Sequence, residues 1–317
     1  MDHLELDLLP TERARDDLDL DALATSDLVD TLVAEHASAA EAVRSAGPAL
    51  ARAIEAVALR LAGGGRLIYA GAGTAGRMGL IDAVECPPTF GTDPETVQAL
   101  LAGGRRAATE VVEDGEDDTA AAERHVHELA LGPTDALLAL SASGSTPYAL
   151  AALTAAAARG ALTIGVTANA GTPLADRADI AVVAATGPEP LAGSTRLKAG
   201  TAQKVIVNTL STAVMVRLGK TYGNRMVAVQ ASNAKLRDRA QRIVAEAAAV
   251  DREHALAALR ASDWDVKAAI VSVRRGVDAA TARRLLDEAS GRLRLVVGDP
   301  PWGPGRDGSD QDPAGAD

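Results

Sequence analysis

Aromatic side chains and cysteines are scarce in this chain of 317 residues. Phe, Tyr and Trp together make up 2% of the residues, whereas 47% are hydrophobic, so the core must be built mainly from Ala, Leu and Val. Small aliphatic side chains favour closely packed helices. The one cysteine, Cys86, excludes an intramolecular disulfide and any cysteine-rich metal site.

The chain also has fewer basic than acidic residues and lacks a long apolar run. The net charge is −11, which argues against nucleic acid or an anionic membrane as a main partner. An anionic small molecule is still allowed, because clustered N–H groups and a Lys or Arg outweigh the overall charge at short range. No apolar stretch reaches about 18 residues, and the acidic N-terminus is unlike a signal peptide, so we expect a cytoplasmic protein.

Short apolar segments alternate with helical patterns through the middle of the chain, and this alternation predicts a mostly parallel sheet covered on both faces. The expected strands are residues 66–70, 97–101, 135–140, 162–167 and 179–184. A helix from Arg196 to Leu218 is apolar on nearly every side, as is typical of a helix buried centrally.

Helical patterns dominate both ends of the chain. A capped helix is expected from Ser26 to Arg44, and a second from Pro48 to the glycines at 63–65. No strand is expected after Tyr222, and further helices are predicted at 233–260, 264–275 and 278–290. The residues from Gly298 onward are rich in Gly, Pro and Asp and are expected to be disordered.

Two loops of small residues each follow an expected strand and open a helix. The first runs from Gly71 to Arg77 and reads GAGTAGR, and the second runs from Ser141 to Thr146 and reads SASGST. This arrangement turns backbone N–H groups and a helix N-terminus toward an anion. Two such loops together predict a pocket for a phosphorylated small molecule.

The first loop also matches the glycine pattern of dinucleotide-binding proteins. Such a site needs an acidic residue at the end of a second strand, about 20 positions further on. Here that stretch is Cys86–Gly91, which contains two prolines and no strand end. The second loop has no place in the dinucleotide scheme either, so no nucleotide cofactor is expected.

The second loop carries four hydroxyl side chains within six residues: Ser141, Ser143, Ser145 and Thr146. One of them is expected to cap the following helix, but a cap needs only one. A phosphate offers several acceptor oxygens, and hydroxyl and N–H donors satisfy them without a fixed cation. We therefore expect this loop to contact phosphate.

The acidic residues outside the two loops are weaker evidence for a functional site than the loops themselves. Glu85 precedes the Pro87-Pro88 pair, in a loop expected at the carboxyl end of the sheet, where α/β sites form. Residues 113–118 form an acidic run before a helix, and most of these charges are expected to stabilise its N-terminus. One of them is expected to face the pocket, and spacing alone does not say which.

Lys198 and Lys204 are expected to meet an anion or a carboxylate, because both lie on the apolar helix that begins near Arg196. The five histidines show neither metal-ligand spacing nor a Ser-His-Asp arrangement, so no metal is expected. They are His3, His36, His125, His127 and His254.

Three motifs of this chain resemble the N-acetylmuramic acid 6-phosphate etherase family. They are Gly71–Arg77, Glu85–Gly91 and Gly193–Lys204, and the similarity continues to about residue 295. The resemblance implies a sugar isomerase (SIS) domain, an α/β fold of three layers with a mostly parallel five-stranded sheet, whose serine-threonine loop binds a sugar phosphate. It divides the chain into an N-terminal arm and helices (1–54), the SIS domain (55–222), a small all-helical region (223–297) and a disordered tail (298–317).

The resemblance also implies an activity, cleavage of the D-lactyl ether at C3 of N-acetylmuramic acid 6-phosphate. The products are N-acetylglucosamine 6-phosphate and D-lactate, as in the recycling of cell-wall amino sugars. By the family motif, Glu85 donates a proton to the departing lactate and Glu116 is the second catalytic carboxylate. The substrate-binding residues are Gly73, Thr74, Lys198 and the four hydroxyls of the second loop.

Two carboxyl groups suffice for this chemistry. Opening the sugar exposes a C1 aldehyde, which acidifies the C2 proton; a carboxylate removes that proton, a carboxylic acid protonates the lactyl oxygen, and water then adds at C3. Neither metal nor nucleotide is required. The chain departs from the family pattern at Ala75, where a serine is commoner, so one hydroxyl of the first loop is missing.

The resemblance further implies a homodimer with the active site at or near its two-fold interface. Two other functions share the same architecture. One is a non-catalytic sugar-phosphate sensor of the glucokinase regulatory protein type, and the other is a sugar-phosphate isomerase. A sensor has no need of the pair Glu85 and Glu116, and an isomerase would not expel a leaving group.

Overall fold

The computed structural model describes residues 9–229, 231 and 233–302, which form two compact units. One unit comprises the chain through Cys86 together with Thr92–Val214, and the other comprises Pro87–Gly91 together with the chain from Met215 onward. The division of the chain into an N-terminal segment, a SIS domain, a helical region and a tail, made from the sequence, remains a prediction. Of the tail expected to be disordered, residues 303–317 lie outside the described residues.

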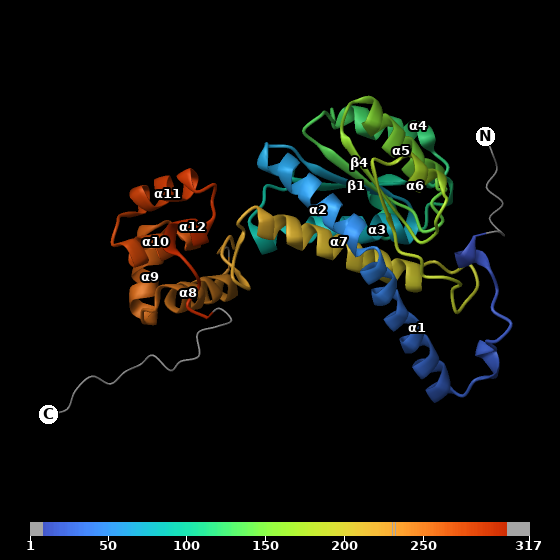
Figure 1. Cartoon of the computed structure of the whole chain (residues 1–317), viewed down its shortest axis with the longest axis horizontal. Coiled ribbons are helices and arrows are strands. Elements are labelled where there is room, and N and C mark those ends of the chain that lie inside the picture. Colours follow the sequence, from blue (N-terminus) through green and yellow to red (C-terminus); the bar gives the residue numbers. More distant parts are fainter. Residues whose placement is uncertain (1–8, 230, 232, 303–317) are drawn as a thin grey trace. The chain divides into compact units, whose positions relative to one another are not determined.

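The first unit is built on a five-stranded parallel sheet (Figure 1). Its strands are β1 (Leu67–Gly71), β2 (Val97–Leu101), β3 (Ala136–Leu140), β4 (Leu162–Thr167) and β5 (Ile180–Val183), in the order β2-β1-β3-β4-β5. All five predicted strands are confirmed to within one residue. Every residue of β1, β3 and β4 is buried, which explains the mainly apolar sequences of these strands.

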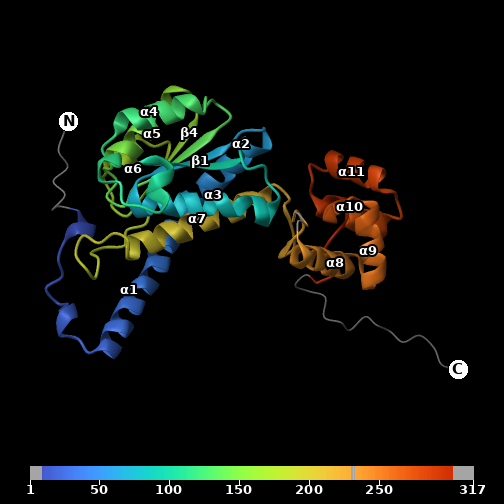
Figure 2. The same cartoon turned by 180° about the vertical axis from the view of Figure 1, so that it is seen from behind.

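Helices cover both faces of this sheet and confirm the three-layer prediction (Figures 1 and 2). On one face lie α4 (Thr119–Glu128), α5 (Pro147–Ala158) and α6 (Pro173–Arg177); on the other lie α2 (Gly47–Ala62), α3 (Gly73–Phe90) and α7 (Lys198–Arg217). The long helix α1 (Thr25–Ser45) extends away from the sheet (Figure 1). It begins after Ala24, so Ser26 is not its cap.

Helix α3 differs from its prediction at its C-terminal end. The Pro87-Pro88 pair was expected to follow the helix and brace a loop, but the helix continues through both prolines to Phe90. A proline lacks the backbone N–H and disturbs a helix most in its interior. Here both prolines lie in the last turn, where Gly91 N still bonds to Pro87 O at 2.9 Å. Glu85 is consequently a helical residue.

In its described residues, the second unit has helices and one short antiparallel ribbon. The ribbon pairs β6 (Thr221–Tyr222) with β7 (Arg225–Met226), so the prediction that strands end at Tyr222 was wrong by one short strand. The helices are α8 (Ala234–Ala248), α9 (Arg252–Ala261), α10 (Val266–Arg275), α11 (Ala279–Glu288) and α12 (Leu293–Val297).

The single helix predicted over 233–260 is in fact two. Ala249 adopts a left-handed conformation (φ 53°) that ends α8, and the Asp251 carboxylate caps α9 by accepting from His254 N at 2.8 Å. In the part of the chain that the structure describes, no helix is both long and apolar enough to cross a membrane.

Candidate active site

A cavity of about 370 Å³ lies in the first unit, where the loops after β1 and β3 meet. These strands are neighbours, and the chain proceeds from β1 outward to β2 on one side and to β3 on the other. A crevice at the carboxyl ends of strands forms where the strand order reverses in this way. The wall consists of Glu12, Ala72, Gly73, Thr74, Ala75, Glu116, Ser141, Ala142, Ser143, Thr146, Thr195 and Gln203.

The hydroxyls of the second loop form a continuous hydrogen-bonded chain. Ser145 Oγ donates to Ser143 Oγ at 2.9 Å, Ser143 and Ser141 are joined at 3.2 Å, and Ser141 and Thr146 at 2.9 Å. Thr146 Oγ1 donates in turn to Glu116 Oε1 at 3.0 Å. Each hydroxyl has one hydrogen. Because that of Thr146 goes to Glu116, Ser141 must donate to Thr146 and Ser143 to Ser141, so the chain runs in one direction and ends on the carboxylate.

Gly144 allows this loop to turn tightly. Its φ of +75° is a left-handed conformation, and its N–H donates to Ser141 Oγ at 2.9 Å. A Cβ at this position would lie 2.2 Å from Thr172 Oγ1 and 2.8 Å from Thr167 Oγ1. Only glycine therefore fits. Of the two serines beside it, Ser143 lines the cavity, whereas the predicted site residue Ser145 is not part of the wall.

Glu116 is the residue of the acidic run that reaches the cavity. Its backbone is anchored from α5, because Tyr148 N donates to Glu116 O at 2.9 Å. Asp118 caps α4 instead, accepting from Ala121 N at 2.8 Å, as was expected for most charges of this run. The side chain of Glu116 is exposed, so its second oxygen is accessible to a ligand.

The first loop contributes its small residues and a helix end. Gly73, Thr74 and Ala75 line the cavity, and α3 begins at Gly73. The free N–H groups of this helix terminus favour an anion, whatever side chain stands at Ala75.

Glu85 does not lie at this cavity. It is an exposed residue of α3, twelve positions after Gly73, where the helix begins at the cavity wall. At a rise of about 1.5 Å per residue, its Cα is about 18 Å away along the helix axis. The expectation that it occupies a loop at the carboxyl end of the sheet was wrong, because the chain remains helical through the prolines and α3 leads away from the cavity at which it begins. One chain therefore does not bring Glu85 and Glu116 together.

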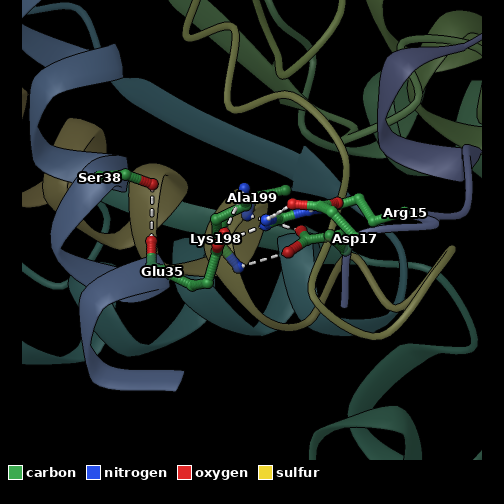
Figure 3. A network of polar contacts seen from close by, with 7 residues as sticks. Arg15, Asp17, Glu35, Ser38, Lys198 and Ala199 are labelled. Atoms are coloured by element: carbon green, nitrogen blue, oxygen red, sulfur yellow. Dashed lines mark hydrogen bonds and ion pairs between the residues drawn. The ribbon is translucent and has the colours of Figure 1, made fainter. Parts of the chain in front are cut away.

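Lys198 does meet a carboxylate, as expected, but this carboxylate belongs to α1. Its Nζ lies 2.7 Å from Glu35 Oε2, and both side chains are largely buried (Figure 3). Arg15 contacts the same glutamate and also pairs with Asp17 at 2.9 Å. Burial raises the pKa of Glu35, but the hydrogen bonds from Lys198 and Arg15 outweigh it and keep the pKa below its usual value. Substrate contact by Lys198 stays a prediction.

A buried glutamate fixes the start of α7. Glu189 is fully buried, and its two carboxylate oxygens accept from Lys198 N and Ala199 N, each at 2.9 Å. This carboxylate satisfies the N-terminal N–H groups that a helix leaves unpaired. By fixing the start of α7, Glu189 also fixes the positions of two cavity residues: Thr195, just before the helix, and Gln203, in the helix.

Lys204 belongs to a polar cluster between α3 and α7. Its Nζ donates to Asn208 Oδ1, and Asn208 Nδ2 donates to Asp82. Asp82 also accepts from Tyr69 at 2.7 Å and Ser211 at 3.0 Å. Burial raises the pKa of Asp82, and these donors oppose the rise.

Three residues of the wall lie outside the two predicted loops and the acidic run: Glu12, Thr195 and Gln203. Thr195 and Gln203 lie inside the motif Gly193–Lys204, which could have identified them. Glu12 gave no signal, because its position depends on a contact between Thr11 and Asn169, 158 residues apart in sequence.

Two family models match the chain. The model of the glucokinase regulatory protein N-terminal SIS domain matches residues 49–157. The model of the SIS domain matches residues 110–213. Together the two matches span the five strands of the sheet and both loops of the cavity.

Curated relatives match over most of their own length. A protein named N-acetylmuramic acid 6-phosphate etherase from Streptomyces avermitilis is 51% identical, over 92% of this chain and 94% of the relative. A protein of the same name from Rubrobacter xylanophilus is 50% identical, over 94% of this chain and 99% of the relative. Another from Deinococcus radiodurans is 49% identical, over 91% of this chain and 95% of the relative.

Proposed function

The chain belongs to the N-acetylmuramic acid 6-phosphate etherase family, and from this premise we propose how its residues divide the reaction. The substrate is N-acetylmuramic acid 6-phosphate, and the products are N-acetylglucosamine 6-phosphate and D-lactate. The observation that carries the proposal is the hydroxyl chain that ends on Glu116, because it joins a phosphate-binding loop and a catalytic carboxylate in one cavity.

The second loop binds the 6-phosphate. In this structure the hydroxyl hydrogens of Ser141, Ser143, Ser145 and Thr146 are directed to other side chains. A phosphate brings strong acceptor oxygens, to which the three serine hydroxyls and nearby backbone N–H groups turn, while Thr146 continues to donate to Glu116. The N-terminus of α3 at Gly73 and Thr74 adds further N–H donors and a favourable dipole.

Glu116 acts on the sugar at C2 in the open-chain aldehyde. Its carboxylate takes the C2 proton, the C2–H electrons form the C2–C3 double bond, and the C3–O bond to the lactyl group breaks. A carboxylic acid protonates the departing oxygen, which gives lactate. Water then adds its oxygen at C3 and a proton returns to C2. The sequence of steps balances without an oxidant or reductant.

Glu85 supplies the proton to the lactyl oxygen, and it does so from a second copy of the chain. Within one chain Glu85 lies on α3 about 18 Å beyond the cavity wall by helix rise. Two large apolar side chains on the same part of α3, Ile81 and Val84, are 41% and 65% exposed. Exposed apolar surface beside a functional carboxylate favours a closed pair of subunits that share their sites.

The enzyme works in the cytoplasm in this proposal, since a sugar phosphate carries charges that keep it from crossing membranes. A regulator of the glucokinase regulatory protein type is less well supported, because the curated relatives at about 50% identity are named etherases.

The experiment that tests the function is lactate release from N-acetylmuramic acid 6-phosphate by the purified protein and by Glu116→Gln. We expect the wild type to release lactate and the variant to be at least about 100-fold slower, which is a usual loss when acid–base catalysis is removed. Glu123→Gln, an exposed glutamate of α4, is the matched control and should be as active as wild type. No lactate from the wild type, or full activity in Glu116→Gln, would overturn the proposal.

A further inference from the structure

Gln203 presents an unused hydrogen-bond donor at the cavity. The residue is only 3% exposed and forms part of the cavity wall. Among the described residues, none accepts a hydrogen bond from its Nε2. A buried donor is costly to leave unpaired, and a donor on a cavity wall is satisfied when the cavity is filled. The Nε2 atom has almost no accessible surface of its own, so the amide must turn toward the cavity to donate to a ligand acceptor.

The position of Gln203 is fixed by close packing of α7 on the first loop. Gly200 lies one turn earlier on the same face of the helix. A Cβ at Gly200 would be 3.2 Å from Thr74 Cγ2. The helix thus lies directly against the loop that opens α3, and Gln203 follows at the next turn beside the cavity.

Glu12 brings a carboxylate to the same cavity from the N-terminal arm. The short helix η2 (Pro10–Glu12) is tied down at the fully buried Thr11, whose N–H and Oγ1 bond to the Asn169 amide at 3.3 and 3.0 Å. Asn169 Nδ2 also donates to Ala142 O at 2.9 Å, so the arm is attached to the serine loop itself.

A glycine makes room for the carboxylate of Glu12. Gly193 has a φ of +73°, and a Cβ there would lie 2.9 Å from Glu12 Oε2. The carboxylate is thus packed against the backbone of the loop before α7. Glu12 Oε1 accepts from Thr11 Oγ1 at 3.5 Å, and the partly exposed carboxylate has further acceptor positions for a donor on a ligand.

The wall therefore offers a donor at Gln203 and an acceptor at Glu12, and neither belongs to the loop that we assign to phosphate. A secondary amide carries an N–H and a C=O that point in opposite directions within one rigid plane. We propose that Glu12 and Gln203 form the subsite for the acetamido group at C2: Gln203 Nε2 donates to the acetyl oxygen, and Glu12 accepts from the amide N–H. This inference rests on the proposed function, because it takes an N-acetylated sugar phosphate as the ligand.

The subsite makes the protein selective for a 2-acetamido sugar. A sugar with a hydroxyl at C2 lacks the acetyl oxygen and leaves the buried donor of Gln203 unpaired. Sites built around a polar contact reject ligands that lack the matching group more strongly than apolar pockets do. Selectivity at C2 should therefore depend on Gln203 and be independent of the phosphate.

Calorimetric binding of N-acetylglucosamine 6-phosphate and glucose 6-phosphate tests this directly. We expect the wild type to bind the acetamido sugar at least about tenfold more tightly. Gln203→Met has similar length but no amide, and should lower this ratio by weakening only the acetamido sugar. Gln203→Glu, which replaces the donor by an acceptor, should weaken that sugar further. Glu12→Gln should also weaken the acetamido sugar selectively.

Ser143→Ala is the control, since it should weaken both sugars equally through the phosphate. Thermal unfolding of each variant checks that it is folded. The proposal is overturned if the wild type binds both sugars equally, or if folded Gln203→Met weakens both sugars to the same degree or neither. These measurements need no turnover. A selective wild type that releases no lactate would refute the proposed function and leave the subsite intact.

Discussion

Thr146 Oγ1 donates a hydrogen bond to Glu116 Oε1 over 3.0 Å. The loop that we assign to phosphate is in this way tied directly to the carboxylate that we assign to the C2 proton. Glu116 is also held through its backbone by Tyr148, at the first turn of the helix that Thr146 precedes. The loop and the carboxylate to which we assign these roles are therefore held by the same helix start.

Thr146→Val should lower kcat/KM for lactate release by about 10- to 100-fold, because a hydrogen bond to a charged group contributes roughly 1.5–3 kcal/mol. The valine keeps the branched shape and removes the hydroxyl, whereas Thr146→Ser keeps the hydroxyl and should stay within about threefold of wild type. Equal activity of the valine variant and wild type would show that the hydroxyl does not position Glu116.

Ser143→Ala should weaken phosphorylated sugars selectively. The loss of charge-assisted hydrogen bonds to phosphate corresponds to at least about tenfold in Kd. Binding of N-acetylmuramic acid 6-phosphate and of N-acetylmuramic acid without phosphate is compared in the wild type and the variant. If both ligands lose the same affinity, the second loop does not hold the phosphate.

Mixed dimers test whether Glu85 acts from the partner. Glu85→Gln and Glu116→Gln proteins are each expected to be inactive. When equal amounts are unfolded and refolded together, half of the dimers pair one of each, and each mixed dimer has one intact site if the site is shared. Activity should return to about one quarter of wild type. Light scattering should report about twice the chain mass of 32.3 kDa. No recovery from a mixture that is dimeric would place both glutamates in the same chain.

Lys267 should make the stability of the helical unit depend on pH. Its Nζ donates to Gly219 O at 2.9 Å and Gly291 O at 2.8 Å, and burial, aided by the nearby Lys220, lowers its pKa to about 8. Between this value and the ordinary value near 10.5, the unfolded chain binds the proton and the folded chain does not. Stability contributed by this group therefore rises with pH and is lost as pH falls through 8.

Urea unfolding of wild type and Lys267→Met between pH 8 and pH 10 measures this effect. The free energy of unfolding of the wild type should gain about 2 kcal/mol relative to the variant over that range. Other lysines and the tyrosines are present in both proteins and cancel in the comparison. A difference that does not change with pH would contradict the lowered pKa.

The sequence predicted most of the fold of the first unit because its strands are short, mainly apolar and bounded by loops. β1 and β3 are buried along their whole length, so their apolar runs are unambiguous. The course of α3 through Pro87 and Pro88 could not be predicted from proline preferences, since these describe the helix interior and not its last turn.

Only part of the cavity could be predicted from the sequence, because some of its residues belong to local motifs and others depend on tertiary packing. The two loops are local motifs, and Glu116 entered through the family resemblance. Glu12 and the unpaired amide of Gln203 depend on tertiary packing, through the Thr11–Asn169 contact and the approach of Gly200 to Thr74. The break between α8 and α9 was missed because alanine rarely adopts the left-handed conformation seen at Ala249.

Lactate produced from N-acetylmuramic acid 6-phosphate in water enriched in oxygen-18 tests the etherase reaction most directly. Elimination breaks the bond between C3 and the ether oxygen, so this oxygen leaves with the lactate and the solvent oxygen enters the sugar. We predict that mass spectrometry finds unlabelled D-lactate and N-acetylglucosamine 6-phosphate labelled at C3. Labelled lactate, or no lactate at all, would contradict the proposed reaction.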